Sequence, residues 1–188
     1  MKVFILEGIA TSGKSTIIQQ LKSSLSGLQL TIADEVETHI PIMNDPGVSH
    51  VDFFIDLVKQ KLASNSDLVI FDRLYLTQAF RSKSGLSAYT AVEELLLPHE
   101  SLTIFLKVND AAIADRIYKA SQQRGASWEG YIKTKGQTIE QIAEYYSMQQ
   151  SNQLELLKAP ALPYKIFDTT KYNYQESIEE LVALATKS

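Results

Sequence analysis

Short apolar runs alternate with longer amphipathic stretches along the whole chain. Five of the runs are short and predominantly apolar, which is typical of strands in a sheet that is covered on both faces. Apolar residues between these runs recur at helical spacing. The alternation predicts one α/β domain with a parallel sheet and right-handed crossovers. The predicted strands are Val3–Leu6, Leu28–Ala33, Leu68–Phe71, Leu102–Leu106 and Tyr164–Phe167.

Two stretches interrupt the alternation, and loops held by a rigid sheet often carry function. Glu37–His50 contains two prolines, a glycine and an Asn-Asp pair, so we expect a loop there. Ala120–Gly136 is polar and contains three glycines, and we expect it to form a mobile segment between two helices. Thr138 and Gln141 form a capping-box pattern, which predicts the start of the second helix.

Composition narrows the classes of function. The chain has no cysteine, which excludes disulfides, thiolate metal sites and a cysteine nucleophile. A formal net charge of −4 argues against nucleic acid as the main partner, because such binding draws on surplus Lys and Arg. The histidines lack metal-ligand spacing, and we expect them in loops or on the surface. The first apolar run is too short for a signal peptide and no run could span a bilayer, so we expect a cytoplasmic protein without a membrane partner.

The residues after the first predicted strand match a phosphate-binding loop. The eight residues Gly8–Ser15 satisfy G-x-x-x-x-G-K-[ST], and a helical apolar pattern follows them. Glycines let successive N–H groups face one point, and the helix N-terminus adds partial positive charge. Lys14 is expected to reach the β- and γ-phosphates of ATP, and Ser15 to ligate Mg²⁺. The predicted nucleotide-binding residues are Gly8, Ala10, Thr11, Ser12, Gly13, Lys14, Ser15 and Thr16.

Arginine is scarce and confined to the middle of the chain. The arginines are Arg73, Arg81, Arg116 and Arg124. Solubility needs no such clustering, whereas the planar fork of arginine suits phosphate clamping. Arg73 directly follows a predicted strand and Asp72, which places it at a carboxyl end of a parallel sheet, where ligands bind. We therefore expect Arg73, Arg116 and Arg124 to contact phosphate groups. For Arg81 the pattern favours neither a phosphate contact nor an ordinary surface position.

These motifs resemble one group of proteins, the P-loop kinases of nucleosides and nucleoside monophosphates. The run from Leu6 to Thr16 is similar to the opening of thymidylate kinases and deoxynucleoside kinases. Phe71-Asp72-Arg73 with Thr77 is similar to their Asp-Arg-Tyr…Ser and Glu-Arg-Ser…Ser segments. The resemblance implies an α/β P-loop NTPase fold, with a five-stranded parallel sheet, helices on both faces and a short lid at about 120–136. It also implies phosphoryl transfer from ATP, with Mg²⁺, to a small acceptor.

Charge and position give roles to the remaining candidates. Lys14, with Arg73, Arg116 and Arg124, would neutralise phosphate oxygens during the transfer. Asp72 ends an apolar strand and would hold the metal, or its water, together with Ser15.

Two further residues are expected on the acceptor and base sides. Glu35 matches the Glu that deoxynucleoside kinases use as a base toward a sugar hydroxyl, so it is the candidate catalytic base. Asp168 follows the last predicted strand and is expected to line the adenine pocket.

The acceptor side departs from both families. Ala10 stands where thymidylate kinases carry Asp, and Val36 follows Glu35 where deoxynucleoside kinases have Pro. The sequence therefore predicts an ATP- and Mg-dependent phosphotransferase acting on a nucleoside or nucleoside monophosphate, similar to thymidylate kinase. The alternatives are a kinase of another small hydroxyl compound, such as a sugar or antibiotic, and a non-catalytic nucleotide-binding regulatory module. The oligomeric state is left open, a homodimer included.

Overall fold

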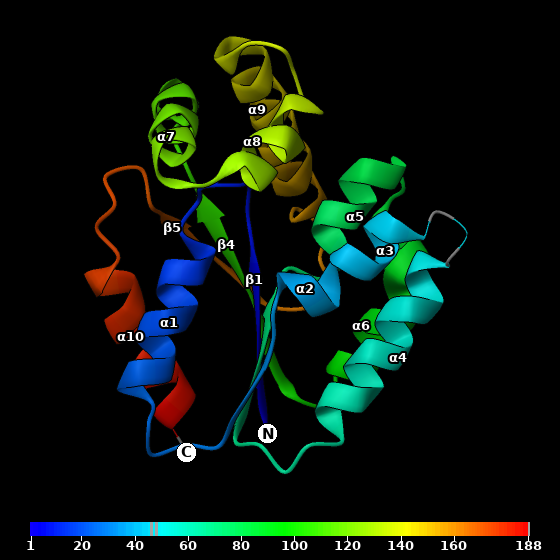
Figure 1. Ribbon diagram of the computed structural model, residues 1–188. Coiled ribbons are helices and arrows are strands. Elements are labelled where there is room, and N and C mark those ends of the chain that lie inside the picture. Colours follow the sequence, from blue (N-terminus) through cyan, green and yellow to red (C-terminus); the bar gives the residue numbers. More distant parts are fainter. Residues whose placement is uncertain (46, 48, 188) are drawn as a thin grey trace.

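The computed structural model describes residues 1–45, 47 and 49–187. Five parallel strands form one sheet in the order β2-β3-β1-β4-β5, which confirms the predicted α/β fold (Figure 1). All five apolar runs are strands, with ends shifted by one or two residues. The strands are β1 (Lys2–Glu7), β2 (Leu30–Ala33), β3 (Leu68–Asp72), β4 (Glu100–Lys107) and β5 (Tyr164–Asp168).

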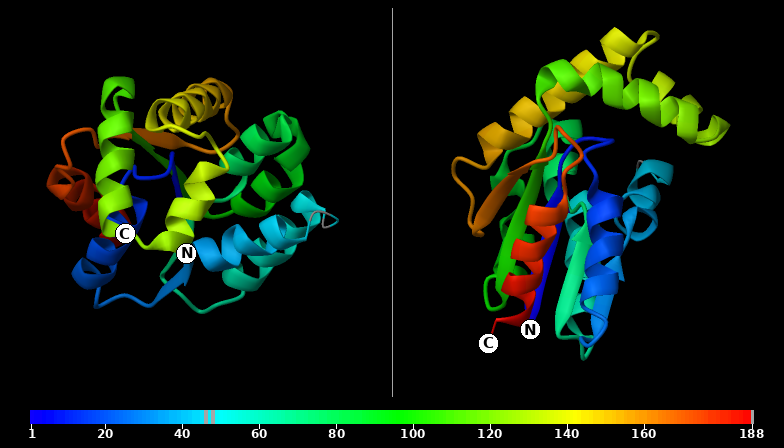
Figure 2. Two further views of the ribbon diagram at one scale, coloured as in Figure 1. Left: turned by 45° about the horizontal axis from the view of Figure 1, so that its top comes forward. Right: turned by 90° about the vertical axis from the view of Figure 1, so that its left-hand side faces the viewer.

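Helices cover both faces of the sheet and one of its ends. In Figure 1, α1 and α10 lie on one side, α4 and α6 lie on the other, and α7–α9 lie above the carboxyl ends of the strands. Figure 2 shows α7–α9 arching over that end, while both chain ends lie at the opposite end. The helices are α1 (Lys14–Ser24), α2 (Glu35–Thr38), α3 (Ile40–Asn44), α4 (His50–Leu62), α5 (Tyr75–Ser82), the 3₁₀ helix η1 (Leu86–Tyr89), α6 (Thr90–Leu96), α7 (Asp110–Gln123), α8 (Ala126–Lys133), α9 (Ile139–Leu156) and α10 (Gln175–Thr186).

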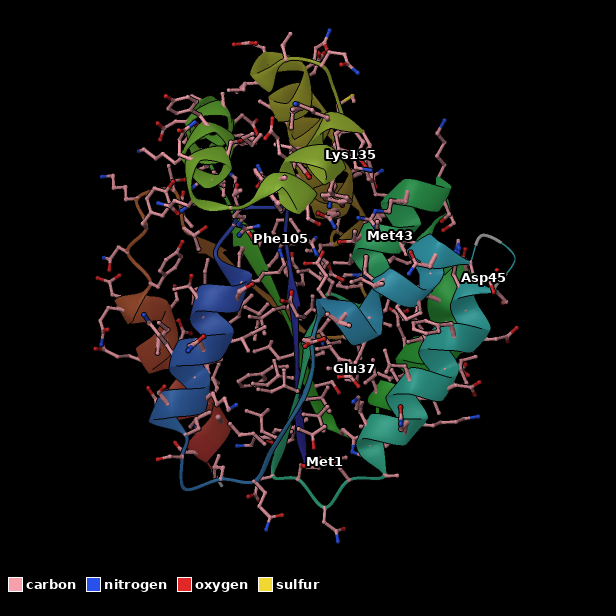
Figure 3. All side chains as sticks on the ribbon, viewed as in Figure 1. Met1, Glu37, Met43, Asp45, Phe105 and Lys135 are labelled. Carbon is pink, nitrogen blue, oxygen red and sulfur yellow. The ribbon has the colours of Figure 1, made fainter. Side chains whose placement is uncertain are left out.

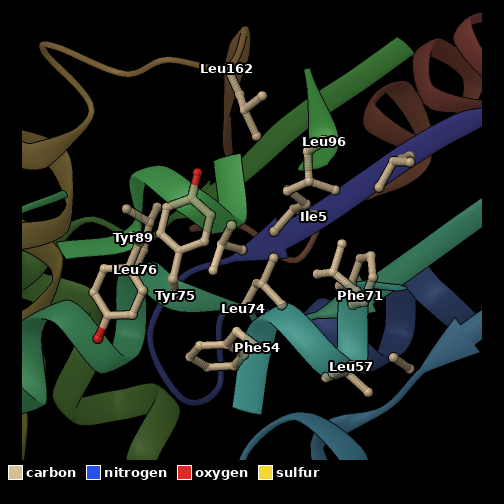
Figure 4. Close-up of a cluster of buried hydrophobic side chains, with 14 of the residues drawn as sticks. Ile5, Phe54, Leu57, Phe71, Leu74, Tyr75, Leu76, Tyr89, Leu96 and Leu162 are labelled. Carbon is tan, nitrogen blue, oxygen red and sulfur yellow. The ribbon is translucent and has the colours of Figure 1, made fainter. Parts of the chain in front are cut away.

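The central strand β1 divides the core into two layers. Side chains alternate across a strand, so Val3 and Ile5 face one layer while Phe4 and Leu6 face the other. The first layer packs against α4–α6 and contains a group of buried aromatic and aliphatic side chains, including Phe54 (Figure 4). The second packs against α1 and α10. Burial on both faces explains why β1 reads as a continuous apolar run.

The strand register brings the carboxyl ends together. Leu6 pairs with Asp72 of β3 on one side and with Ile104 of β4 on the other. The loop after β1 therefore starts beside the end of β3, and Arg73 donates its backbone N–H to the carbonyl of Leu6 at 2.9 Å. The sheet thus places the glycine-rich loop against the Asp-Arg segment 65 residues further on.

The prediction of a loop at Glu37–His50 is wrong for residues 37–44, which are mostly helical. The helices α2 and α3 occupy residues 35–38 and 40–44. Pro41 lies in the first turn of α3, where its missing N–H would have no partner in any case, so it starts this helix and does not break it. Asp34 caps α2 by accepting the N–H groups of residues 36 and 37. The predicted loop at Pro46 and Val48 lies outside the described residues.

Ala120–Gly136, which we expected to form a mobile segment between two helices, is itself mostly helical. Its first residues complete α7, and α8 occupies Ala126–Lys133. The polar composition concealed an amphipathic helix, because Ile132 is buried in a third core cluster with residues of α7 and α9. The capping box of Thr138 and Gln141 is confirmed at the start of α9. We call residues 120–136 the lid segment. Within the described part of the chain, every helix is too short or too polar to cross a membrane.

Candidate active site

The loop between β1 and α1 has the backbone that phosphate binding requires. Gly8 and Gly13 have φ values of 135° and 101°, which favour glycine. A Cβ at Gly8 would lie 2.6 Å from the carbonyl oxygen of Leu106, and one at Gly13 would lie 2.5 Å from the ring of Tyr174. Helix α1 starts at Lys14, so its free N–H groups and positive dipole end point at the loop.

Lys14 is folded into the loop. Its Nζ donates to the carbonyls of Gly8 at 3.1 Å and Ile9 at 3.0 Å, and the side chain is almost fully buried. Burial, and after it the nearby Arg73, lower the pKa of Lys14 to about 8 against the opposing pull of acidic neighbours. A phosphate on the loop would give this ammonium the anionic partner that it lacks.

A cavity of about 990 Å³ opens above this loop. It lies between the loop, α2–α3 and the helices α7 and α8, and Met43 on α3 is one of its exposed apolar lining residues (Figure 3). The predicted site residues at positions 10, 11 and 13–16 line it, together with Glu35, Arg73, Arg116 and Arg124. Gly8 and Ser12 belong to the loop beneath. The sheet thus gathers residues of the predicted donor and acceptor sides around one space.

Arg73 and Glu35 form an ion pair at this cavity. Arg73 has a φ of 67°, and its Nη1 donates to the carbonyl of Gly8 at 2.7 Å. Its Nε lies 3.3 Å from Oε1 of Glu35. Burial tends to raise the pKa of Glu35, but Arg73 and Lys14 outweigh it and hold that pKa below its ordinary value. Glu35 is therefore ionised at neutral pH.

Of the two predicted magnesium ligands, Ser15 lines the cavity, whereas Asp72 is not among its lining residues. Asp72 is 5% exposed, and its Oδ1 has no hydrogen-bond partner among the described residues. Burial raises the pKa of Asp72, so a cation would stabilise the ionised form. Ser15 is exposed in the first turn of α1. No three acidic or histidine side chains converge in the described ranges, but Mg²⁺ commonly takes one or two protein ligands plus phosphates and water.

Arg116 of α7 donates to the backbone of the loop between β1 and α1. It is 1% exposed, and its Nη1 donates to the carbonyl of Thr11 at 2.7 Å. Nη2 donates to the carbonyl of Thr169, and the guanidinium carbon lies 4.0 Å from the centre of the Tyr172 ring. These contacts hold the loop, and a direct contact of Arg116 with the transferring group stays a prediction.

Of the other two arginines, Arg124 lies in residues 120–136 and Arg81 contacts that segment from α5. Arg124 is exposed at the end of α7, and its guanidinium carbon lies 5.1 Å from the centre of the Trp128 ring. Arg81 donates to the hydroxyl of Tyr131 at 2.8 Å, which joins α5 to α8. Asp168 does not join the cavity: it is exposed, lines a separate hollow and accepts the N–H of Thr170.

Two buried residues of this region carry little sequence signal. Glu7 is fully buried, and its carboxylate accepts the N–H groups of Leu74 and Leu76 at 2.9 and 3.1 Å. In the sequence, Glu7 is marked only as a charged residue at the end of an apolar strand. His39 was expected in a loop or on the surface, yet it is fully buried beside the cavity, and neither ring nitrogen has a hydrogen-bond partner among the described residues. Burial, Arg81 and the other nearby cations hold the pKa of His39 well below its usual range.

Comparisons with known proteins show the fold. No family model matches the sequence, and no curated protein matches it. Among solved structures, the chain is similar to the YorR protein of Bacillus subtilis in complex with phosphorylated GDP, with 17% identity, a TM-score of 0.64, and 97% of this chain and 94% of that chain covered.

Two similar structures are kinases. Deoxyadenosine kinase from M. mycoides, with the products dCMP and a flexible dCDP bound, has 20% identity and a TM-score of 0.55, with 100% of both chains covered. Shikimate kinase from Acinetobacter baumannii in complex with shikimate has 13% identity and a TM-score of 0.55, covering 97% of this chain and 91% of that chain. The chain therefore has the α/β fold of P-loop kinases.

Proposed function

We propose that this protein transfers the γ-phosphoryl group of ATP to the hydroxyl of a nucleoside. The observation that carries this proposal is the Glu35–Arg73 pair, 3.3 Å apart on the wall of the cavity that Lys14 also lines. It places an ionised carboxylate beside the phosphate loop, where an acceptor hydroxyl would enter.

On the donor side, the chain supplies positioning and positive charge. The loop N–H groups and Lys14 would hold the β- and γ-phosphates, and Arg124 would meet the charge that develops on the transferred group. Mg²⁺, held by Ser15 and Asp72, would neutralise phosphate oxygens when bound. Arg116 would keep Thr11 and the rest of the loop in place through its two backbone contacts.

On the acceptor side, Glu35 would orient the hydroxyl and take its proton. Its low pKa makes it a weak base, but phosphoryl transfer is loose and the proton can leave late, so orientation matters more than basicity. Arg73 is already paired with the carboxylate of Glu35, so its charge is balanced. This favours a neutral hydroxyl acceptor over an anionic one. A nucleoside monophosphate is the second candidate, and the exposed Arg124 on the cavity wall is the observation that favours it.

The cavity walls suit a planar ring. Val36, Ile40 and Met43 are 61%, 42% and 48% exposed, and all three line the cavity from α2 and α3. Trp128 and Tyr131 line it from α8. Flat apolar and aromatic surfaces favour a nucleobase over a polyol with a carboxylate.

A substrate panel with matched glutamate variants tests the proposal. ADP release should be measured with nucleosides, nucleoside monophosphates, shikimate and simple sugars, and the fastest turnover is expected with a nucleoside. Glu35→Gln should lower kcat by about 10²-fold or more. Glu37→Gln, in the same helix but paired with Lys61, should leave kcat unchanged. Turnover of sugars alone, or equal effects of both variants, would contradict the proposal.

A further inference from the structure

The hydroxyl of Thr77 lies at the centre of a buried hydrogen-bond network. It donates to Oε2 of Glu7 at 3.1 Å and accepts from Nη1 of Arg73 and from Nε2 of Gln153, each at 3.1 Å. Glu7, Thr77 and Gln153 are fully buried. One hydroxyl thus uses its single hydrogen and both lone pairs to join β1, α5 and α9.

Arg73 needs such support because its backbone is strained. A φ of 67° is uncommon for a residue with a side chain, and such a conformation persists only where the surroundings hold it. Helix α5 follows directly and has no side-chain cap from its own N-cap residue. Glu7 replaces that cap from β1, by accepting the N–H groups of Leu74 and Leu76.

We propose that Thr77, held between Glu7 and Gln153, is a positioning residue for Arg73. The proposal rests on the proposed function, in which Arg73 and Glu35 face the acceptor hydroxyl. Without the Thr77 hydroxyl, Arg73 Nη1 keeps only the carbonyl of Gly8, and the guanidinium can turn away from Glu35. Gln153 lies on α9, the helix that follows the lid segment. The Thr77 hydroxyl therefore connects α9 to Arg73, which faces the proposed acceptor site.

Removal of the Thr77 hydroxyl distinguishes a network that only stabilises the fold from one that positions Arg73. If the hydroxyl only stabilised the fold, its loss would lower the unfolding temperature and leave kcat unchanged. If it positions Arg73, its loss should lower kcat while ATP still binds, because Lys14 and the loop are intact. Misplacement of a catalytic group by about 1 Å can cost about 10²-fold in rate.

The test compares Thr77→Val, which keeps the shape and removes the hydroxyl, with Thr77→Ser, which restores it. We expect Thr77→Val to lower kcat about 10²-fold with the Kd for ATP unchanged, and Thr77→Ser to recover most of the rate. Gln153→Leu removes one partner only, and it should lower kcat measurably but by no more than about tenfold. Ser101→Ala removes a buried hydroxyl that donates to the carbonyl of Leu96 at 2.7 Å, and should leave kcat unchanged.

A crystal structure of Thr77→Val provides a readout without turnover. The proposal expects the guanidinium of Arg73 to turn away from Glu35, so that the 3.3 Å contact between them is lost. An unchanged Arg73, or equal kcat for the Val and Ser variants, would overturn it.

A wild-type protein that uses a different acceptor would instead overturn the nucleoside assignment, and the same variants could then be compared with that acceptor. If Thr77→Val fails to fold, Gln153→Leu and its crystal structure decide, and a wild-type rate with Arg73 in place would count against the proposal.

Discussion

The guanidinium of Arg116 donates to the carbonyl oxygen of Thr11 across 2.7 Å, although 105 residues separate them in the chain. This bond ties α7 to the loop between β1 and α1. Arg116 also donates to the carbonyl of Thr169, whose hydroxyl in turn donates to the carbonyl of Ser12 in the loop. The loop is therefore held from two sides, by its own helix and by α7. Movement of α7 would be transmitted directly to the backbone that binds phosphate.

Arg116→Ala should destabilise the protein as well as weaken ATP binding. It leaves one buried and one partly buried carbonyl without their charged donor, so we expect a loss of about 2–4 kcal/mol in the free energy of unfolding. Arg124→Ala is the matched control, because Arg124 is exposed and its loss should cost less than about 1 kcal/mol. Denaturant titration of both variants measures this. Equal stability of the two would show that Arg116 does not hold the loop.

The lid segment should order when a triphosphate binds. Its helix α8 has eight residues and buries only Ile132, so local opening should cost little free energy. Hydrogen exchange over residues 120–136 should be fast in the free protein and slow with a non-hydrolysable triphosphate. Arg124→Ala should lower kcat far more than ATP affinity, because its contact strengthens in the transition state. Equal protection in both states with an unchanged kcat would leave this segment as a surface helix.

Lys14 makes stability depend on pH in a defined window. Its pKa of about 8 in the folded protein lies below the ordinary 10.5, so between these values the unfolded chain binds more protons. The contribution of Lys14 to stability therefore rises with pH across this window, and below it the cost of the buried ammonium is fully present. Lys14→Met should unfold at a higher temperature than wild type at pH 7 without nucleotide, with a gap that narrows toward pH 10. Lys22→Met, exposed on the same helix, should show no such trend, and a constant gap for Lys14→Met would refute the assignment.

Gly13 should tolerate no side chain. Its φ of 101° and the Tyr174 ring, 2.5 Å from an added Cβ, predict that Gly13→Ala loses at least about 2 kcal/mol of stability together with ATP binding. Gly27→Ala has open space and should be almost neutral. Thermal unfolding with and without ATP compares the two. A Gly13→Ala protein that binds ATP normally would contradict the loop geometry.

The sequence predicted those features that local patterns encode. Strand β1, the loop after it and the capping box at Thr138 follow from periodicity and motif, and the structure confirms them. At β5 the same reasoning failed in part: Tyr164 and Ile166, on one face of this edge strand, are 41% and 45% exposed, whereas Phe167 on the other face packs against the second core layer. Strand order, which decides burial, is not written in any one segment.

The supporting residues of the site could not be predicted for a related reason. Glu7 and Thr77 are 70 residues apart, and their contact depends on β1 and β3 being neighbours. The backbone contacts of Arg116 arise in the same way, from the meeting of α7 with the loop. His39 offered no periodicity or spacing that marked it as buried. Motifs therefore predicted the residues expected to touch phosphate, while the residues that hold them became visible only in three dimensions.

The cavity lined by Lys14, Arg73 and Glu35 is proposed to be the place where a phosphoryl group passes from ATP to an acceptor hydroxyl. A single-turnover experiment with γ-phosphate-labelled ATP, Mg²⁺ and a nucleoside mixture tests it most directly. We predict that the label appears as a nucleoside monophosphate with wild-type protein, and that a folded Lys14→Ala protein is slower by about 10²-fold or more. Label that remains in ATP or appears only as inorganic phosphate, or a Lys14→Ala protein as fast as wild type, would contradict the account.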